Sequence, residues 1–148
     1  MSDQALACRK LAMDLLARRE HSRLELERKL AARGFDRALV GDVLATLETD
    51  GLLSAERFAQ SFVASRYARG QGPLRIRQDL AERGAAAAAA CIDDSRFDWS
   101  ALAKEVRIKR FGAGPPASLK EKAKQIRFLE YRGFGQEQIR HALRLDDE

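Results

Sequence analysis

Large apolar residues recur every three to four positions along most of the chain, which is the spacing of one face of an α-helix. The clearest case is the segment 37–49, where five apolar side chains share one face: Leu39, Val40, Val43, Leu44 and Leu47. No stretch alternates apolar and polar residues as a half-exposed β-strand would. The 25 alanines and 19 leucines outnumber the 11 β-branched residues, and alanine and leucine are the stronger helix formers. The pattern predicts an all-α protein.

A short motif, Leu-x-x-Arg-Gly, occurs three times. Its glycines, Gly34, Gly84 and Gly133, are 50 and 49 residues apart. The motif is typical of a helix end, because the leucine faces the core, the arginine lies near the negative end of the helix dipole, and the glycine adopts the left-handed conformation that closes the helix. Three copies at nearly equal spacing indicate a duplicated module.

Each copy of the motif is expected to close the middle helix of a three-helix module. Ser22 and Ser118 are each followed by a glutamate three residues later, a capping box that opens the middle helix of the first and third modules. In the second module Pro73 takes the first helical position. The predicted three-helix repeats are 1–51, 52–95 and 96–148. Because such modules contact mainly their neighbours, we expect the tandem repeats to form an elongated array.

Flanking helices complete the modules, and they are expected near 4–19, 37–49, 55–69, 85–92, 98–111 and 136–145. One of them departs from the pattern. Gly84 is followed by six alanines, Ala85–Ala90, where the other modules carry large apolar residues. Alanine favours a helix but buries little surface, so the helix near 85–92 should pack weakly.

The net charge of +5 is unevenly distributed. Residues 1–50 carry nine basic and nine acidic side chains, whereas 101–148 carry eleven and seven. The segment 57–77 has five arginines and no acidic residue. The planar guanidinium of arginine suits bidentate contacts with phosphate or carboxylate, so this distribution indicates a surface that binds nucleic acid, a nucleoprotein or an acidic protein. A solvated helix face that only keeps the chain in solution is the alternative.

Twelve cations are the candidates for such a surface. Arg57 is set apart as structural, because it lies in the first turn of its helix, where the helix dipole disfavours a cation. Arg69, Arg75 and Arg77 flank the turn 70–73 and are expected to be exposed. The partner-binding candidates are Arg66, Arg69, Arg75, Arg77, Lys104, Arg107, Lys109, Arg110, Lys120, Lys122, Lys124 and Arg127.

Side chains that support catalysis are scarce. His21 and His141 lie near helix ends among charged residues, and His21 is expected at the surface. Cys8 and Cys91 are expected to be free thiols, because their spacing suits neither a disulfide framework nor a zinc site. The glycines of the turn 70–73 lack the preceding strand and the following lysine of a phosphate loop. We predict a binding protein, not an enzyme, with no cofactor and no metal; a hydrolase that uses Cys91 or a histidine is a remote alternative.

The location is predicted from what the sequence lacks. No run approaches the roughly 20 apolar residues of a membrane-spanning helix. The first residues lack the basic and then apolar segments of a secretory signal. With two free thiols expected in a reducing compartment, we predict a cytoplasmic protein that does not contact membranes.

The middle of the chain carries a specific resemblance. The segment 54–76, SAERFAQSFVASRYARGQGPLRI, resembles the central signature of the RecX family. The flanking segments 15–34 and 124–143 fit the same family, so the resemblance covers almost the whole chain. Ala55 stands where the family usually has an aspartate, which weakens the expected helix cap. The run of six alanines is a second departure and affects the packing of the second module.

The resemblance implies a small bacterial regulator of the RecA recombinase. It implies tandem three-helix repeats that bind the RecA–DNA filament within its groove and restrain ATP hydrolysis, strand exchange and the coprotease role of RecA in the SOS response to DNA damage. It supplies no catalytic residue. The partner implied is RecA in its DNA filament, with weak direct contact to single- or double-stranded DNA as an addition, and we expect a monomer.

The residues by themselves leave a second reading open. Three short helices joined by a turn are also how helix-turn-helix proteins that bind DNA directly are built. The chain contains no asparagine and few glutamines, which limits the bidentate contacts to adenine that sequence-specific readers use. The alternative function is therefore direct DNA binding of the helix-turn-helix type.

Overall fold

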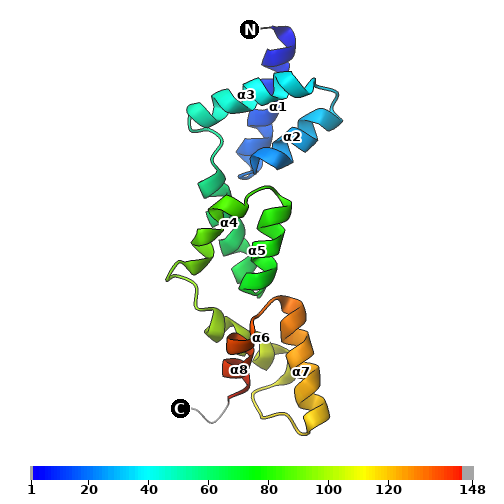
Figure 1. Cartoon of the computed structure of the whole chain (residues 1–148), viewed down its shortest axis with the longest axis vertical. Coiled ribbons are helices and arrows are strands. Elements are labelled where there is room, and N and C mark those ends of the chain that lie inside the picture. Colours follow the sequence, from blue (N-terminus) through cyan, green and yellow to red (C-terminus); the bar gives the residue numbers. More distant parts are fainter. Residues whose placement is uncertain (1, 145–148) are drawn as a thin grey trace. The chain divides into compact units, whose positions relative to one another are not determined.

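The computed structural model describes residues 2–144 (Figure 1). These residues form eight α-helices and one 3-10 helix, and none of them lies in a β-strand, so the all-α prediction is confirmed. None of these helices is long and apolar enough to cross a lipid bilayer. The helices are α1 (Asp3–Arg18), α2 (Arg23–Ala32), α3 (Arg37–Thr49), α4 (Ala55–Ala68), α5 (Pro73–Glu82), η1 (Ala86–Asp93, the 3-10 helix), α6 (Trp99–Phe111), α7 (Leu119–Arg132) and α8 (Gln136–Leu143).

The chain divides into two compact units. The first unit runs from the start of the described chain to Phe62 and includes Leu80–Ala89, and the second unit comprises Val63–Asp79 and the chain from Ala90 onward. The division passes through α4, α5 and η1, so each of these helices contributes residues to both units. The repeat boundaries and the elongated array stay predictions. Small-angle scattering tests the latter, because a compact globule of this length has a radius of gyration of about 15 Å.

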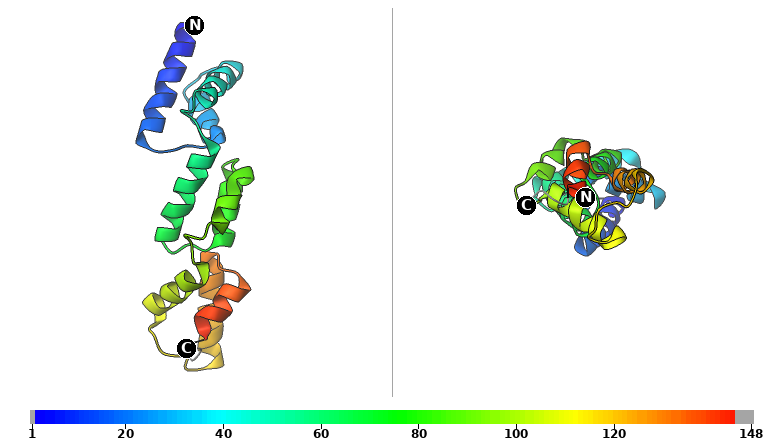
Figure 2. Two further views of the ribbon diagram at one scale, coloured as in Figure 1. Left: turned by 90° about the vertical axis from the view of Figure 1, so that its left-hand side faces the viewer. Right: turned by 90° about the horizontal axis from the view of Figure 1, so that it is seen from below.

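The first unit is built around α1, α2 and α3, which lie side by side (Figure 2). The predicted capping box opens α2: the hydroxyl of Ser22 accepts from the backbone N–H of Glu25 at 3.1 Å, and the Glu25 carboxylate accepts from the N–H of Ser22 at 2.9 Å. Gly34 follows the end of α2 with φ of +89°, as the helix-end motif predicts. The core is formed by the apolar faces of the three helices, including Leu26, Leu30, Val40, Leu44 and Leu47.

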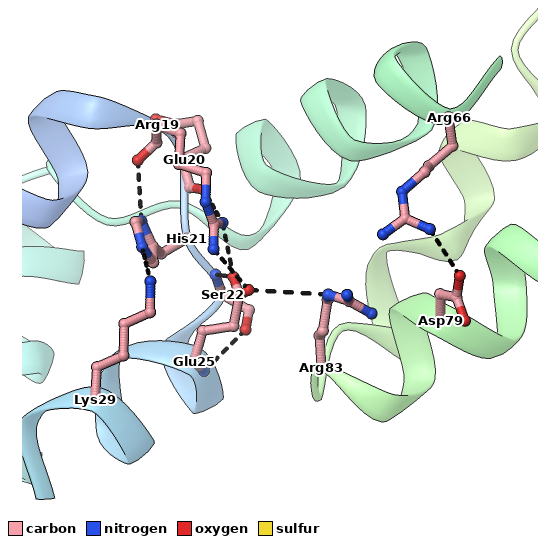
Figure 3. Close-up of polar contacts among 9 residues, drawn as sticks. All are labelled: Arg19, Glu20, His21, Ser22, Glu25, Lys29, Arg66, Asp79 and Arg83. Carbon is pink, nitrogen blue, oxygen red and sulfur yellow. Dashed lines mark hydrogen bonds and ion pairs between the residues drawn. The ribbon is translucent and has the colours of Figure 1, made fainter. Parts of the chain in front are cut away.

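His21 corrects one expectation in this unit: it is buried, not at the surface. Its Nδ1 lies 3.0 Å from the carbonyl oxygen of Arg19, and its Nε2 lies 2.9 Å from the Nζ of Lys29 (Figure 3). Because a carbonyl only accepts and an ammonium only donates, the ring is neutral with its proton on Nδ1. Burial lowers the pKa of His21, and the neighbouring cations lower it further.

In the second unit α6, α7 and α8 enclose a core that includes Leu102, Ala103, Leu129, Phe134 and Ala142, and α6 packs most extensively on α8. The serine predicted to cap α7 does so, since its hydroxyl accepts from the N–H three residues later at 3.1 Å. Leu129, the leucine of the third helix-end motif, is fully buried, as expected. Local signals therefore placed both ends of α7 correctly.

The turn before α5 docks on the end of α7 through backbone groups. The N–H of Gly72 donates to the carbonyl of Arg132 at 2.7 Å, and the N–H of Leu74 donates to the carbonyl of Gly133 at 2.9 Å. A Cβ on Gly72 would clash with the carbonyl group of Gly133, and a Cβ on Gly133 would clash with Arg75. Two glycines distant in sequence are thus needed at one close backbone approach.

The alanine-rich segment departs from the expected α-helix near 85–92, because η1 is a 3-10 helix. Its buried residues Ala89 and Ile92 are three positions apart, which matches the three residues per turn of a 3-10 helix. The carbonyl of Ile92 accepts a hydrogen bond from the indole Nε1 of Trp99 at 2.9 Å. Alanine side chains bury little surface, so they do little to stabilise an α-helix here. The conformation of η1 is instead set by the burial of Ala89 and Ile92 and by the hydrogen bond from Trp99.

Candidate binding surface

All twelve predicted binding residues lie in the second unit. They differ in how far they reach into solvent. Arg66, Arg75 and Lys104 are half-buried, and Arg107 is fully buried. The exposed candidates are Arg69, Arg77, Lys109, Arg110, Lys120, Lys122, Lys124 and Arg127.

Arg107 holds the core together and does not face a partner in this structure. Its Nε donates to the Oε1 of Gln125 on α7 at 2.9 Å, and its Nη2 donates to the carbonyl of Gly114 at 2.5 Å. Its Nη1 is buried with no hydrogen-bond partner among the described residues. Burial lowers the pKa of the Arg107 guanidinium. The spacing carried a signal, because residue 107 falls four positions after the buried Ala103 on the same face of α6.

Arg66 is tied to its own unit by neighbouring side chains. Its Nη1 lies 2.9 Å from the Oδ2 of Asp79 and donates to the Oε1 of Gln71 at 3.0 Å (Figure 3). The acid that pairs with it lies two residues beyond the acid-free segment 57–77. Arg75 lies against Tyr131, with its guanidinium carbon 5.6 Å from the ring centroid. These two arginines therefore have structural contacts within the second unit.

Four cations converge on one groove of the second unit, with a volume of about 330 Å³. Arg69 follows the end of α4, Lys109 and Arg110 end α6, and Arg132 ends α7. The structure thus brings together members of two clusters that are 40 residues apart in sequence. The remaining lining residues are Ala68, Gly70, Leu102, Glu105, Val106 and Phe128. We call this feature the basic groove.

An aromatic ring and a tight turn hold the cations of the basic groove in place. The guanidinium carbons of Arg110 and Arg132 lie 5.3 Å and 5.2 Å from the ring centroid of Phe128, within the range of cation–π attraction. The Nη1 of Arg132 also donates to the carbonyls of Arg69 at 3.3 Å and Gly70 at 3.4 Å. Gly70 has φ of +80°, and a Cβ there would lie 3.0 Å from Val106.

Arg132 is the groove residue that the sequence analysis missed, because it was assigned only to a helix end. A signal was present: Phe128 and Arg132 are four residues apart, so they share one face of α7. What sequence spacing could not supply is the approach of this face to the turn at Gly70, which is 62 residues away.

The groove cations form no ion pair within the part of the chain that the structure describes. Within residues 2–144, no carboxylate lies within 4.0 Å of the charged nitrogens of Arg69, Lys109, Arg110 or Arg132. Glu105 is the one acidic residue in the groove lining. The second unit contains sixteen basic and eleven acidic residues, whereas the first contains eleven of each. The net charge of the chain therefore resides in the second unit, where an anionic partner would be attracted.

The groups that could perform chemistry lie elsewhere. Burial raises the pKa of the Cys8 and Cys91 thiols, which disfavours the thiolate form that acts as a nucleophile. In the described part of the chain no three His, Cys, Asp or Glu side chains are grouped so that they could hold a metal ion. What the basic groove offers is anion binding.

Comparison with known proteins agrees with the tandem organisation. Family models match the first three-helix domain of RecX over residues 8–47, the second over 56–90 and the third over 98–143. The prediction of three tandem three-helix repeats is therefore confirmed. The repeat boundaries 1–51, 52–95 and 96–148 stay predictions.

Relatives match along nearly the whole chain. The Regulatory protein RecX of Halorhodospira halophila is 49% identical over 144 residues, which cover 96% of this chain and 89% of the relative. The Regulatory protein RecX of Ectopseudomonas mendocina is 44% identical, with complete coverage of both chains. The crystal structure of RecX from Lactobacillus salivarius has the same fold, with a TM-score of 0.79, 17% identity and 97% coverage of each chain. The resemblance seen in the sequence is confirmed, and the chain belongs to the RecX family of regulatory proteins.

Proposed function

We propose that this protein binds the RecA filament on DNA and inhibits the recombinase, ATPase and coprotease activities of RecA. Similarity to proteins named Regulatory protein RecX over nearly the full chain supports a regulator. The observation that supports the binding role is the basic groove of the second unit, whose four cations form no ion pair with any described residue. A DNA-containing filament is a strong anion, and such cations attract it over a distance set by the ionic strength.

The mechanism follows from binding without chemistry. A protein that occupies a filament contacts several RecA protomers at once, and it restrains any movement in which those protomers shift against each other. ATP hydrolysis and strand exchange both require the filament to change state, so a ligand that prefers one state inhibits them. The inhibitor needs no nucleophile, metal or cofactor of its own.

The test uses purified RecA assembled on single-stranded DNA. ATP hydrolysis is followed while this protein is added, and sedimentation of the filament measures how much of it is bound. We expect hydrolysis to fall as the bound fraction rises. The proposed function is wrong if the protein sediments to the same extent with and without the filament. It is also wrong if the protein binds the filament and the rate of ATP hydrolysis does not change.

The same preparation tests the helix-turn-helix alternative. A direct DNA-binding protein of that type should bind bare duplex at physiological salt and discriminate between sequences, with each mismatched base pair costing roughly 1–3 kcal/mol. The proposed function instead predicts stronger binding to the RecA–DNA filament than to bare duplex, with no preference among duplex sequences.

A further inference from the structure

The basic groove is lined by charged and apolar side chains together. Four cations surround it, three of which are arginines that can each offer paired N–H donors to an anion. The apolar residues at its base, Leu102 and Val106, are only 7% and 8% exposed. The feature that distinguishes the groove is its four cations, which favour an anionic ligand.

The groove is also ordered before any ligand binds. Phe128 supports the guanidinium groups of both Arg110 and Arg132, and Arg132 is hydrogen-bonded to the turn that carries Arg69. A binding group that is already held in position loses less conformational entropy when a ligand arrives. Preorganised arginines that form no ion pair with any described carboxylate are suited to the oxygens of a phosphate.

The surroundings of the groove extend the positive field. The helix that supplies Phe128 and Arg132 also carries exposed cations along its length: Lys120, Lys122, Lys124 and Arg127. A ligand with one charge would use only the groove, whereas a polymer of repeated negative charges would also be attracted by this helix. The distribution thus favours a polyanion.

From these observations we infer that the basic groove binds phosphodiester groups of nucleic acid. This inference rests on the proposed function and deepens it, because it names the DNA backbone, and not an acidic surface of RecA, as the component of the filament that the groove contacts. Phosphate contacts carry no base sequence information, so binding in the groove is independent of sequence.

The test is made without RecA. Fluorescence anisotropy measures the binding of labelled oligothymidylate, and separately of a labelled duplex, over a series of salt concentrations. The groove variant is Lys109→Gln/Arg110→Gln. The matched control is Arg28→Gln/Arg37→Gln, which removes two exposed cations from the first unit. Circular dichroism establishes that both variants are folded, and Arg69→Gln is a second groove variant at another exposed position.

We expect the groove variant to bind oligothymidylate about tenfold more weakly or worse at low salt, with the control unchanged. For each phosphate that the variant no longer binds, the dependence of log K on log salt should become shallower by about 0.7 on a single strand and by about 0.9 on a duplex. The nucleic acid whose affinity falls further, single strand or duplex, is the one that occupies the groove.

Three results would overturn the inference. The first is that the wild-type protein binds neither nucleic acid, and the second is that the groove variants and the control bind nucleic acid equally well. The third is that the groove variants bind nucleic acid normally and lose affinity only for the RecA filament, which would show that the groove contacts acidic groups of RecA. The last result leaves the proposed function standing. Failure of the filament assay with normal oligothymidylate binding would instead remove the proposed function alone.

Discussion

The two compact units use their charges differently. In the first unit, arginines pair with acids of the same unit: Arg9 with Asp50, Arg19 and Arg83 with Glu25, Arg23 with Glu27 and Glu48, and Arg57 with Glu20. In the second unit the cations of the basic groove have no such partner among the described residues. Equal numbers of opposite charges allow internal pairing, and an excess of cations leaves charge available for an anion.

Glu25 shows what internal pairing does in the first unit. Burial by itself would raise the pKa of its carboxyl group, but hydrogen bonds from Arg19 and from the backbone of Ser22 outweigh burial and lower the pKa below its usual value. Arg83, close in sequence to the end of α5, reaches the same carboxylate at 3.8 Å (Figure 3). One carboxylate thus connects segments 58 residues apart within the first unit.

In the second unit, backbone hydrogen bonds join the turn before α5 to the end of α7, and removing them should have the largest effect. In Gly72→Ala the new methyl group would meet the carbonyl of Gly133, so the turn must move away from α7 and give up two hydrogen bonds. We expect a loss of roughly 3 kcal/mol or more in the free energy of unfolding, measured with urea. The control Gly114→Ala, which meets no atom within 4 Å, should change it by less than about 0.5 kcal/mol.

The next effect tests charge pairing in the first unit. Glu25→Gln weakens two ion pairs while keeping the size of the side chain, and we expect a loss of roughly 1–3 kcal/mol in urea unfolding. Glu121→Gln is the matched control, because Glu121 holds the same position in α7 but forms no ion pair among the described residues. Equal losses for both variants would mean that the two units do not differ in this respect.

Charge reversal compares the outward faces of the units. Lys122→Glu/Lys124→Glu in α7 should weaken binding to the RecA–DNA filament by about 1–2 kcal/mol, as measured by sedimentation at two salt concentrations. Arg75→Glu/Arg77→Glu should do the same, with an added loss of stability because Arg75 contacts Tyr131. Arg28→Glu/Arg37→Glu in the first unit serves as control. If all three pairs reduce affinity equally, net charge and not its location determines binding.

The smallest expected effect is a pH dependence confined to the first unit. The pKa of His21 is lowered in the folded state, mainly by burial, with Arg19 and Lys29 as nearby cations and Glu25 as the opposing anion. The unfolded chain therefore binds a proton more readily, so the stabilising contribution is present above pH 6.5 and decreases as the pH falls from 6.5 towards the folded pKa. Urea midpoints measured from about pH 7.5 to 5 should decrease in the wild type. A His21→Gln variant with the same slope would contradict this assignment.

The residues that line the basic groove were predicted only in part. Charge clustering identified Arg69, Lys109 and Arg110, because runs of cations without acids are visible in the sequence itself. It also named Arg107, which is buried, and omitted Arg132, because burial and exposure depend on which face of a helix meets the core. His21 was misplaced for the same reason.

The sequence by itself determined the triple repeat and the α-helices with their ends, but not that the alanine-rich segment forms a 3-10 helix. Capping serines, helix-ending glycines and apolar spacing act through neighbours within a few residues, so their effects are local and can be read along the chain. Only the tertiary structure decided which cations share a groove and which are buried. Those outcomes depend on contacts such as the hydrogen bonds from Arg132 to Gly70 and from Gly72 to Arg132, which join segments about 60 residues apart. Spacing along a sequence does not encode such a meeting, because it arises from the packing of whole helices.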